Sequence, residues 1–305
     1  MPSTVRHWYG FWLSLTTAFL WGVLPVFIKL CLETMDAVTI TWYRFGVAGM
    51  AVFFLLWKKR ALPSLRTVSR HKIIWVIIAS LFLVSNYVAN VKGLEYINPE
   101  TTQVLMQLAP FLLMLGGIVF YGERFRNIEK FGALLLFTGL LLFFNDSLFK
   151  LFSAPDDFSL GVLFVILAAV MWTAYALMQK PLLRTLSANQ LTLLIYLLGV
   201  LVLSPFAEIS QLIRMTTLQL FALLFCCANT IIAYGAFTEA LNVWQASKVS
   251  AVIAIAPLFT FISMYFAVQL LPTHFSYSDL DVWAYLGAGI VIFGSALSSL
   301  GKAIK

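Results

Sequence analysis

Ten long apolar runs, separated by short polar links, constrain this sequence more than any other feature. Each run holds about 20 residues, the length that an α-helix needs to cross the roughly 30 Å hydrocarbon core of a bilayer. Only 11% of the 305 residues are charged, against roughly a quarter in a soluble protein. The runs do not alternate as the strands of a barrel do, so we predict an all-α polytopic membrane protein in the lipid bilayer. The predicted spans are 11–31, 37–57, 73–92, 99–121, 131–148, 159–180, 188–207, 217–239, 246–270 and 283–300.

The basic residues predict how the chain is oriented. Fourteen of the twenty Lys and Arg lie before the first span, after spans 2, 4 and 6, or after the last span, whereas the other links are short and acidic. Because cytoplasmic links carry the excess of Lys and Arg, we expect both termini in the cytoplasm. This topology accounts for the net charge of +7 without a nucleic-acid partner. The fourteen are Arg6, Lys58, Lys59, Arg60, Arg66, Arg70, Lys72, Arg124, Arg126, Lys130, Lys180, Arg184, Lys302 and Lys305.

Neither a cleaved leader nor a metal site is indicated. Trp21 and Pro25 interrupt the first span, which fits a retained helix better than the short apolar core of a signal peptide. The three cysteines have no metal-type spacing, so we predict no metal and no cofactor. They are Cys31, Cys226 and Cys227.

The second half of the chain repeats the first. TAFLWGVLPVFIK (17–29) aligns with AAVMWTAYALMQK (168–180) at an offset of 151, and residues 89–110 align with 236–257 at an offset of 147. We therefore predict two repeats, 1–151 and 152–305. Each holds five spans, an odd number, so the second repeat would cross the membrane in the opposite sense to the first. Such inverted repeats are typical of secondary transporters, although duplication is also a simple way to build a helical bundle.

The two halves resemble paired EamA domains of the drug/metabolite transporter superfamily. The second half has Val268-Gln269 where the first has Gly122-Glu123, so it lacks the acidic residue there. The resemblance implies ten helices, cytoplasmic termini, a central cavity between the repeats, and export or exchange of small metabolites such as amino acids. The matching elements are Trp21, Lys29, the region of Leu94, Pro110, Gly122-Glu123, Gly132 and Gly139 in the first half, and Trp172, Leu241, Pro257, Gly287 and Gly294 in the second.

Arg44 is the deepest ionisable residue of the predicted spans, about seven residues into span 2 or roughly 10 Å along the helix. It is either a fixed charge that clamps a carboxylate or phosphate, or a staple that reaches outward to Glu33, Asp36 or Glu100. Lys29, at the outer end of span 1, is expected to snorkel to the membrane surface.

Neutral polar and aromatic side chains recur at helical spacing, which places each set on one helix face. Such rows either line a cavity or bond neighbouring helices, and aromatic faces beside a cation suit a zwitterion. Pro110 and Pro257 occupy matching positions in the two halves and are predicted hinges. The predicted substrate contacts are Arg44, Trp21, Tyr43, Asn86, Asn90, Gln103, Gln107, Trp172, Tyr175 and Gln179.

The predicted function is secondary transport. No Asp or Glu lies near the middle of a span, which favours a facilitator or exchanger over proton coupling. The sequence has no ATP-binding P-loop, and its three histidines lie outside the spans, which disfavours an intramembrane enzyme. We expect a monomer or weak homodimer in the cytoplasmic membrane that exports an amino acid or related carboxylate by alternating access. The alternatives are an importer or exchanger of a metabolite or nucleotide-like anion, and a channel or non-transporting receptor.

Overall fold

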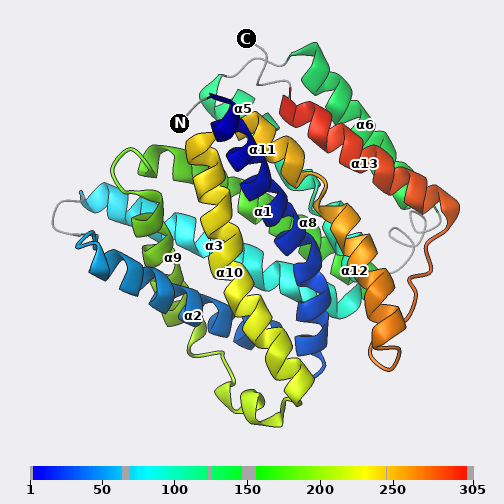
Figure 1. The fold of residues 1–305 in the computed structure, drawn as a ribbon, viewed down its shortest axis with the longest axis horizontal. Coiled ribbons are helices and arrows are strands. Elements are labelled where there is room, and N and C mark those ends of the chain that lie inside the picture. Colours follow the sequence, from blue (N-terminus) through cyan, green and yellow to red (C-terminus); the bar gives the residue numbers. More distant parts are fainter. Residues whose placement is uncertain (1–2, 64–68, 123–125, 146–155, 245, 301–305) are drawn as a thin grey trace.

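The computed structural model is a bundle of helices (Figure 1), described for residues 3–63, 69–122, 126–145, 156–244 and 246–300. Within these ranges every regular element is a helix. The predicted features at Arg66, Glu123, Arg124, Lys302 and Lys305 lie outside the described residues. The first half contains α1 (Ser3–Leu32), α2 (Ala37–Lys58), α3 (Arg70–Tyr96), α4 (Pro99–Leu105), α5 (Leu108–Tyr121) and α6 (Asn127–Phe143). The second contains α8 (Asp157–Leu182), α9 (Ala188–Leu203), the 3-10 helix η2 (Ile209–Arg214), α10 (Thr217–Val243), α11 (Ala246–Ile253), α12 (Ala256–Leu270) and α13 (Val282–Leu300).

Short polar residues set where the helices begin. Asp36 accepts hydrogen bonds from the backbone N–H groups of Val38 and Thr39 at the start of α2, and Ser187 accepts one from Gln190 at the start of α9. These side chains satisfy N–H groups that have no partner inside the helix. Asp36 and Ser187 are 151 residues apart, so equivalent helices of the two repeats start at equivalent residues.

The helix pairings repeat when the two halves are exchanged. α1 packs on α10 as α3 packs on α8, α1 packs on α12 as α5 packs on α8, and α2 packs on α10 as α3 packs on α9. The pairs α2–α9 and α6–α13 join equivalent helices directly. Figure 1 shows the start of α1 and the end of α13 at the same end of the bundle. The structure therefore has an approximate two-fold relation between the repeats.

Predicted spans 4 and 9 are each broken into two helices, which corrects their prediction as continuous helices. The first break lies at Met106-Gln107 and the second at Ala254-Ile255. Pro110 and Pro257 explain both, because proline has no N–H and its ring clashes with the carbonyl four residues earlier. Those carbonyls belong to Met106 and to Ile253, the last residue of α11.

The two breaks meet in the middle of the bundle. Gln107 Nε2 donates to the Ala254 carbonyl at 2.6 Å, so a side chain of one break bonds the backbone of the other. The Thr173 hydroxyl of α8 donates to the Ala109 carbonyl at 3.3 Å. Gly22 of α1 is the repeat equivalent of Thr173, and Ala256 is that of Ala109. A Cβ on Gly22 would lie 2.4 Å from the Ala256 carbonyl oxygen, so only glycine permits this approach.

α6 and α13 form a tight pair at one edge of the bundle (Figure 1). A Cβ on Gly139 would lie 2.7 Å from the Val291 nitrogen, and a Cβ on Gly287 would lie 2.4 Å from the Phe143 nitrogen. Glycine lets two helix backbones approach closely, which is a common basis of packing in lipid. The glycines that mark the repeat in the sequence are therefore contact points between its two copies.

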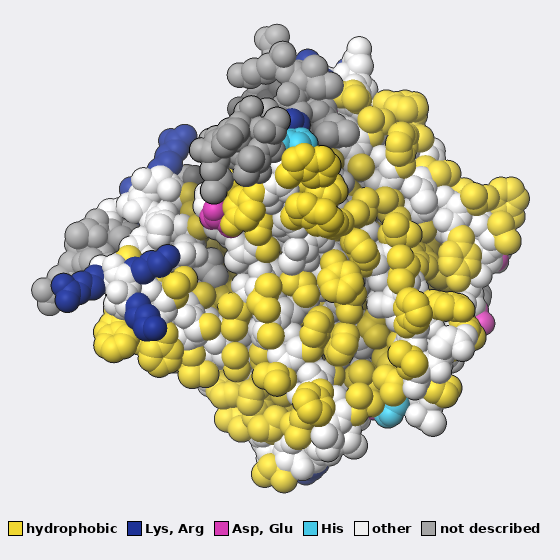
Figure 2. Space-filling view, viewed as in Figure 1, with side chains coloured by type: hydrophobic (Ala, Val, Ile, Leu, Met, Phe, Trp, Pro, Cys, Tyr) yellow, Lys and Arg dark blue, Asp and Glu magenta, His cyan; other side chains and the backbone are white. Residues whose placement is uncertain are grey.

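The outside of the molecule is apolar. Figure 2 shows hydrophobic side chains over most of the visible face, with Lys and Arg gathered toward its left edge. Within the residues that the structure describes, six helices are long and apolar enough to cross a membrane, and two shorter apolar helices are Ala188–Leu203 and Val282–Ser298. Some predicted bounds need correction: the helix of span 1 begins at Ser3, span 5 ends as a helix at Phe143, and span 7 ends at Leu203, shortly before Pro205.

Candidate binding cavity

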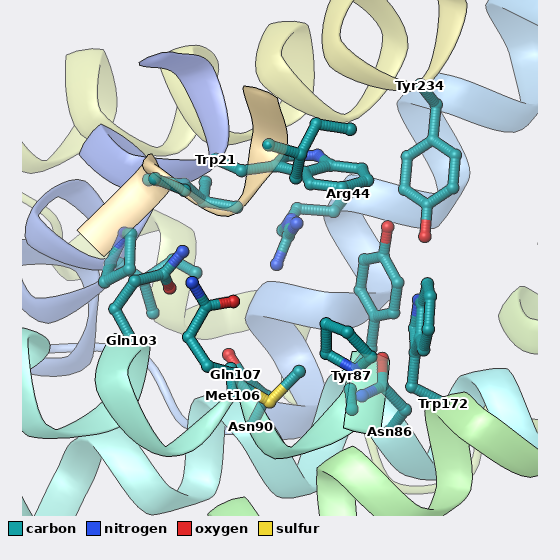
Figure 3. A pocket seen from close by; sticks show the side chains of 17 residues that line it. Trp21, Arg44, Asn86, Tyr87, Asn90, Gln103, Met106, Gln107, Trp172 and Tyr234 are labelled. Atoms are coloured by element: carbon teal, nitrogen blue, oxygen red, sulfur yellow. The ribbon is translucent and has the colours of Figure 1, made fainter. Parts of the chain in front are cut away.

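A cavity of about 190 Å³ lies where the two breaks cross α1, α2, α3, α8 and α10. A single water needs about 15 Å³ on this scale, so the cavity holds on the order of ten water-sized groups. Met106, Ala109 and Pro110 line it from the first break, and Ile253 and Ala256 line it from the second. Figure 3 shows Gln103, Gln107 and Asn90 on one side and Arg44 between them and the aromatic rings, with Asn86 beside Tyr87 and Trp172.

Arg44 projects into this cavity from α2 and is 4% exposed. Its Nε donates to the Thr230 hydroxyl at 3.1 Å, and its Cζ lies 4.7 Å from the centre of the Tyr87 ring. It forms no ion pair with an acidic side chain of the described residues. The predicted staple to an acid is therefore wrong: Glu33 contacts His274, Asp36 caps α2, and Glu100 contacts Ser278.

Four amide side chains line the cavity, and two of them also join helices. Asn86 Nδ2 donates to the Ala168 carbonyl at 2.8 Å, and Gln107 Nε2 donates to the Ala254 carbonyl. Asn90 and Gln103 are half-buried and make no hydrogen bond with the described residues. Some amides of these rows therefore bond neighbouring helices, whereas Asn90 and Gln103 line the cavity and are free to bind a ligand.

The opposite wall is aromatic. Trp21 contacts Tyr234 at 5.5 Å between ring centres, and the hydroxyls of Tyr87 and Tyr234 point toward each other (Figure 3). Trp172 completes this side. No lining residue of the cavity is acidic, so the one formal charge on this part of the described surface is that of Arg44. The N-terminus of α12, at Ala256, adds a partial positive charge.

The structure brings seven of the ten predicted contact residues to the cavity and leaves three outside it. Tyr43 lies nearer the helix end, where its hydroxyl donates to the Ile209 carbonyl at 3.3 Å. Tyr175 packs in an apolar cluster, and Gln179 lies one turn further along α8. Tyr175 and Gln179 were chosen by helix face, which does not specify depth. Tyr43 was chosen as an aromatic residue beside Arg44 in the sequence, but adjacent residues of a helix do not share a face. The seven are Arg44, Trp21, Asn86, Asn90, Gln103, Gln107 and Trp172.

Several lining residues that recur in both repeats were not among the predicted contacts. Tyr87 and Tyr234 are 147 residues apart, as are Met106 and Ile253, and all four line the cavity. Extending the alignment of residues 89–110 by two positions would have found the tyrosine pair. Apolar lining residues such as Leu24 carry no such signal, because they look like ordinary core.

Lys29 was predicted to snorkel, and its partners are backbone groups. Its Nζ donates to the Leu94 carbonyl at 2.5 Å and to the Ile97 carbonyl at 3.4 Å. These carbonyls belong to the last turn of α3, where a cation stabilises the negative end of the helix dipole. Lys29 therefore joins α1 to α3.

Comparison with known proteins identifies the family. The model of the EamA-like transporter family matches the chain twice, at residues 8–145 and 159–300. An uncharacterized transporter of Haemophilus influenzae is 38% identical over 96% of this chain and 95% of its own length. An uncharacterized inner membrane transporter of Escherichia coli K12, YhbE, is 37% identical over 97% of this chain and 92% of its own.

The fold is also found among solved structures, one of which is a crystal structure. That structure superposes with a TM-score of 0.64 at 16% sequence identity and covers 95% of this chain and 97% of its own. The family match confirms the resemblance to paired EamA domains that the repeat indicated. The chain belongs to the EamA-like transporter family.

Proposed function

We propose that this protein is a secondary carrier that moves a small carboxylate, such as an amino acid, out of the cell. Arg44 carries the proposal: it is a buried cation in a cavity between the repeats, and it pairs with no acid among the described residues. A ligand carboxylate would supply the missing charge through two parallel hydrogen bonds to the guanidinium.

The other walls suggest how the rest of the ligand would bind. Asn90 and Gln103 offer both donors and acceptors to an amino or hydroxyl group, whereas Trp172 and Tyr234 offer an apolar surface. An amino acid has groups of each kind around one carboxylate.

The broken helices support alternating access. We infer ten crossings in two inverted repeats, with α4–α5 and α11–α12 each forming one crossing. The approximate two-fold relation would let the same packing arrangement exist with the halves exchanged, so that the cavity opens to either side. Pro110 and Pro257 would act as equivalent hinges, since each lies where its helix is already broken.

The distribution of charge supports a location in the inner membrane with both termini in the cytoplasm. YhbE, which is similar over nearly the whole chain, is named as an inner membrane protein. With this orientation the α1–α2 turn, the α3–α4 link and the α12–α13 loop face outward.

The test is counterflow into liposomes that contain the purified protein, with labelled amino acids, organic acids and nucleotides. Arg44→Ala is measured beside Arg214→Ala, which removes an exposed arginine outside the cavity. We expect counterflow of a carboxylate that Arg44→Ala abolishes and Arg214→Ala preserves, with both variants folded by circular dichroism. Counterflow by no carboxylate, or equal loss in both variants, would refute the proposed substrate class.

A further inference from the structure

The loop between α12 and α13, residues 271–281, is held against the first half of the chain at three points. His274 Nδ1 lies 2.9 Å from Glu33 Oε1, the Ser278 hydroxyl donates to Glu100 Oε1 at 3.0 Å, and Asp281 accepts from Asn145 at 2.9 Å. Phe275, 7% exposed, anchors the loop in an apolar cluster. Under the loop lies a second cavity of about 310 Å³, with Lys29, Asn98, Met264 and Ser278 among its lining residues.

Glu100 is the least expected group under this loop. Its side chain is 5% exposed, and its second oxygen, Oε2, is buried without a hydrogen-bond partner. An ionised carboxylate buried without a cation costs far more than a neutral carboxylic acid in the same place. The N-terminus of α4 offsets only part of that cost, because the helix has seven residues. The closed loop therefore favours the protonated form of Glu100.

The contact between His274 and Glu33 is a second tie between the loop and the first half. The two side chains are 28% and 34% exposed, so solvent and salt weaken the pair. When His274 is protonated, the contact gains a charge pair with both carboxylate oxygens. This contact holds the loop beside Glu100, and the response of the loop to protons rests on the burial of the Glu100 carboxyl.

The other ionisable groups around Glu100 do not cancel this effect. Lys29 is bonded to backbone carbonyls of α3, and Lys92 forms an ion pair with Glu95. The hydrogen bond from Asn145, together with one from the Ala284 N–H, holds the pKa of Asp281 below its usual range, so Asp281 stays ionised in mild acid. The titratable groups on the elements packed around Glu100 are Lys29, Lys92, Glu95, Tyr96, Asp157, His274, Tyr277, Asp279 and Asp281.

We propose that Glu100 is a proton-binding site at the outer end of the carrier, and that proton uptake closes the loop 271–281 over it. Opening the loop would expose the carboxyl to the outer solution, where it ionises at neutral pH. Closure is favoured while Glu100 is protonated and is lost as the pH rises through the titration of the buried acid. The proton returns to the side it came from, so the site shifts the balance between closed and open states without driving transport.

Thiol labelling tests this proposal. Met264→Cys places a thiol in the cavity under the loop, and Thr273→Cys places one on the exposed surface of the loop, outside the residues that line the cavity. Both are labelled with a membrane-impermeant maleimide in spheroplasts at external pH 5.5 and 7.5, and the wild-type protein gives the background of the three buried cysteines. Dividing the Met264→Cys rate by the Thr273→Cys rate removes the pH dependence of the thiol reaction itself.

We expect the normalised rate to be about tenfold lower at pH 5.5 than at pH 7.5, since one proton changes an equilibrium at most tenfold per pH unit. Glu100→Gln, which imitates the protonated acid, should label slowly at both values. Asp279→Asn, which neutralises an exposed carboxylate of the same loop, should keep the parent's ratio. A normalised rate without pH dependence, or a Glu100→Gln protein with the parent's ratio, would overturn the proposal.

Ser278→Ala provides a second variant that leaves Glu100 in place. It removes the hydroxyl that contacts the carboxyl, so labelling at pH 5.5 should become faster, and an unchanged rate would again count against the proposal. The proposal rests on the proposed orientation but not on the substrate. Labelling of Thr273→Cys in spheroplasts tests that orientation directly, so an inverted protein is distinguished from a loop that does not respond to pH.

Discussion

The two repeats contribute the same scaffold to the cavity but different chemistry. Trp21 and Trp172 line it from equivalent positions, as do Tyr87 and Tyr234. Every charged or amide lining residue, in contrast, comes from the first half. Their equivalents at offsets of 151 and 147 are Ile195 for Arg44, Ala233 for Asn86, Phe237 for Asn90, Ser250 for Gln103 and Ala254 for Gln107.

This difference separates two requirements of a carrier. Exchange between two states requires the halves to pack alike, so helix breaks, close glycine contacts and aromatic walls occur in both. Recognition of an asymmetric molecule does not need two copies of the polar groups. After duplication, one repeat can keep a cation and the other can place an aliphatic side chain at the same depth without disturbing the symmetric packing.

Replacing Arg44 should have the largest effect, because this residue is the main chemical difference between the two repeats. Arg44→Ala should reduce counterflow about a hundredfold, because two charge-assisted hydrogen bonds to a carboxylate contribute roughly 3 kcal/mol. Arg44→Lys, which keeps the charge but loses the planar fork, should fall between the wild type and Arg44→Ala. Initial rates in liposomes measure both. Wild-type rates in Arg44→Ala would place recognition outside the polar wall of the first half.

The symmetric part of the comparison is tested at the α6–α13 contact. Gly139→Ala and Gly294→Ala, at equivalent positions of the two repeats, should destabilise the protein by similar amounts, about 1–3 kcal/mol each, because each added Cβ meets backbone of the partner helix. Gly289→Ala is the matched control, since nothing lies within 4 Å of its added Cβ. Thermal unfolding in detergent compares the three. A large effect at one glycine and none at its equivalent would show that the halves do not pack alike.

The polar wall is tested by a pair of equivalent residues. Gln103→Ala should raise the KM for the transported carboxylate about five- to tenfold, the loss of roughly one hydrogen bond. Ser250→Ala, at the equivalent position of the second repeat, and Gln179→Ala, an amide outside the cavity, should change the KM less than about twofold. Concentration dependence of counterflow gives these values. Equal effects at Gln103 and Ser250 would refute the one-sided site.

The smallest expected effect is at the link between the two breaks. Gln107→Ala removes the hydrogen bond to the Ala254 carbonyl and should cost about 0.6 kcal/mol, the average for such bonds in a membrane protein. Gln103→Ala, which removes an amide without a bond to the described residues, should leave the stability unchanged. Both are measured by the unfolding midpoint. A larger loss at Gln103 would mean that its amide is structural.

Much of the helix arrangement was predictable because a membrane leaves a chain few choices. Apolar runs of about 20 residues become helices, since no other open structure satisfies the backbone in lipid. The prolines at 110 and 257 indicated disturbed helices, and Asn86, Gln107 and Arg44 were recognisable as polar residues in apolar runs. The effect of each proline, a complete break that divides a span, depended on the neighbouring helices that accept the freed polar groups.

The depth and partners of side chains were not predictable. Tyr43 and Tyr175 are tyrosines within apolar spans, as Tyr87 is, yet only Tyr87 lines the cavity. Lys29 had the signal of a surface cation and instead bonds the end of α3. In both cases the outcome depends on which helix crosses at that height, and crossing points are set by contacts between residues more than a hundred positions apart.

The sequence by itself determined an all-helical chain, its duplication and its family, because length, apolarity and repetition are properties of consecutive residues. Tertiary structure alone decided that the two breaks meet, that Arg44 lies between an amide wall and an aromatic wall, and that Glu100 is buried beneath a loop from the other half. These features arise where the repeats pack against each other. At this interface the environment of a side chain is formed by residues of both halves, so it cannot be predicted from the sequence of either half.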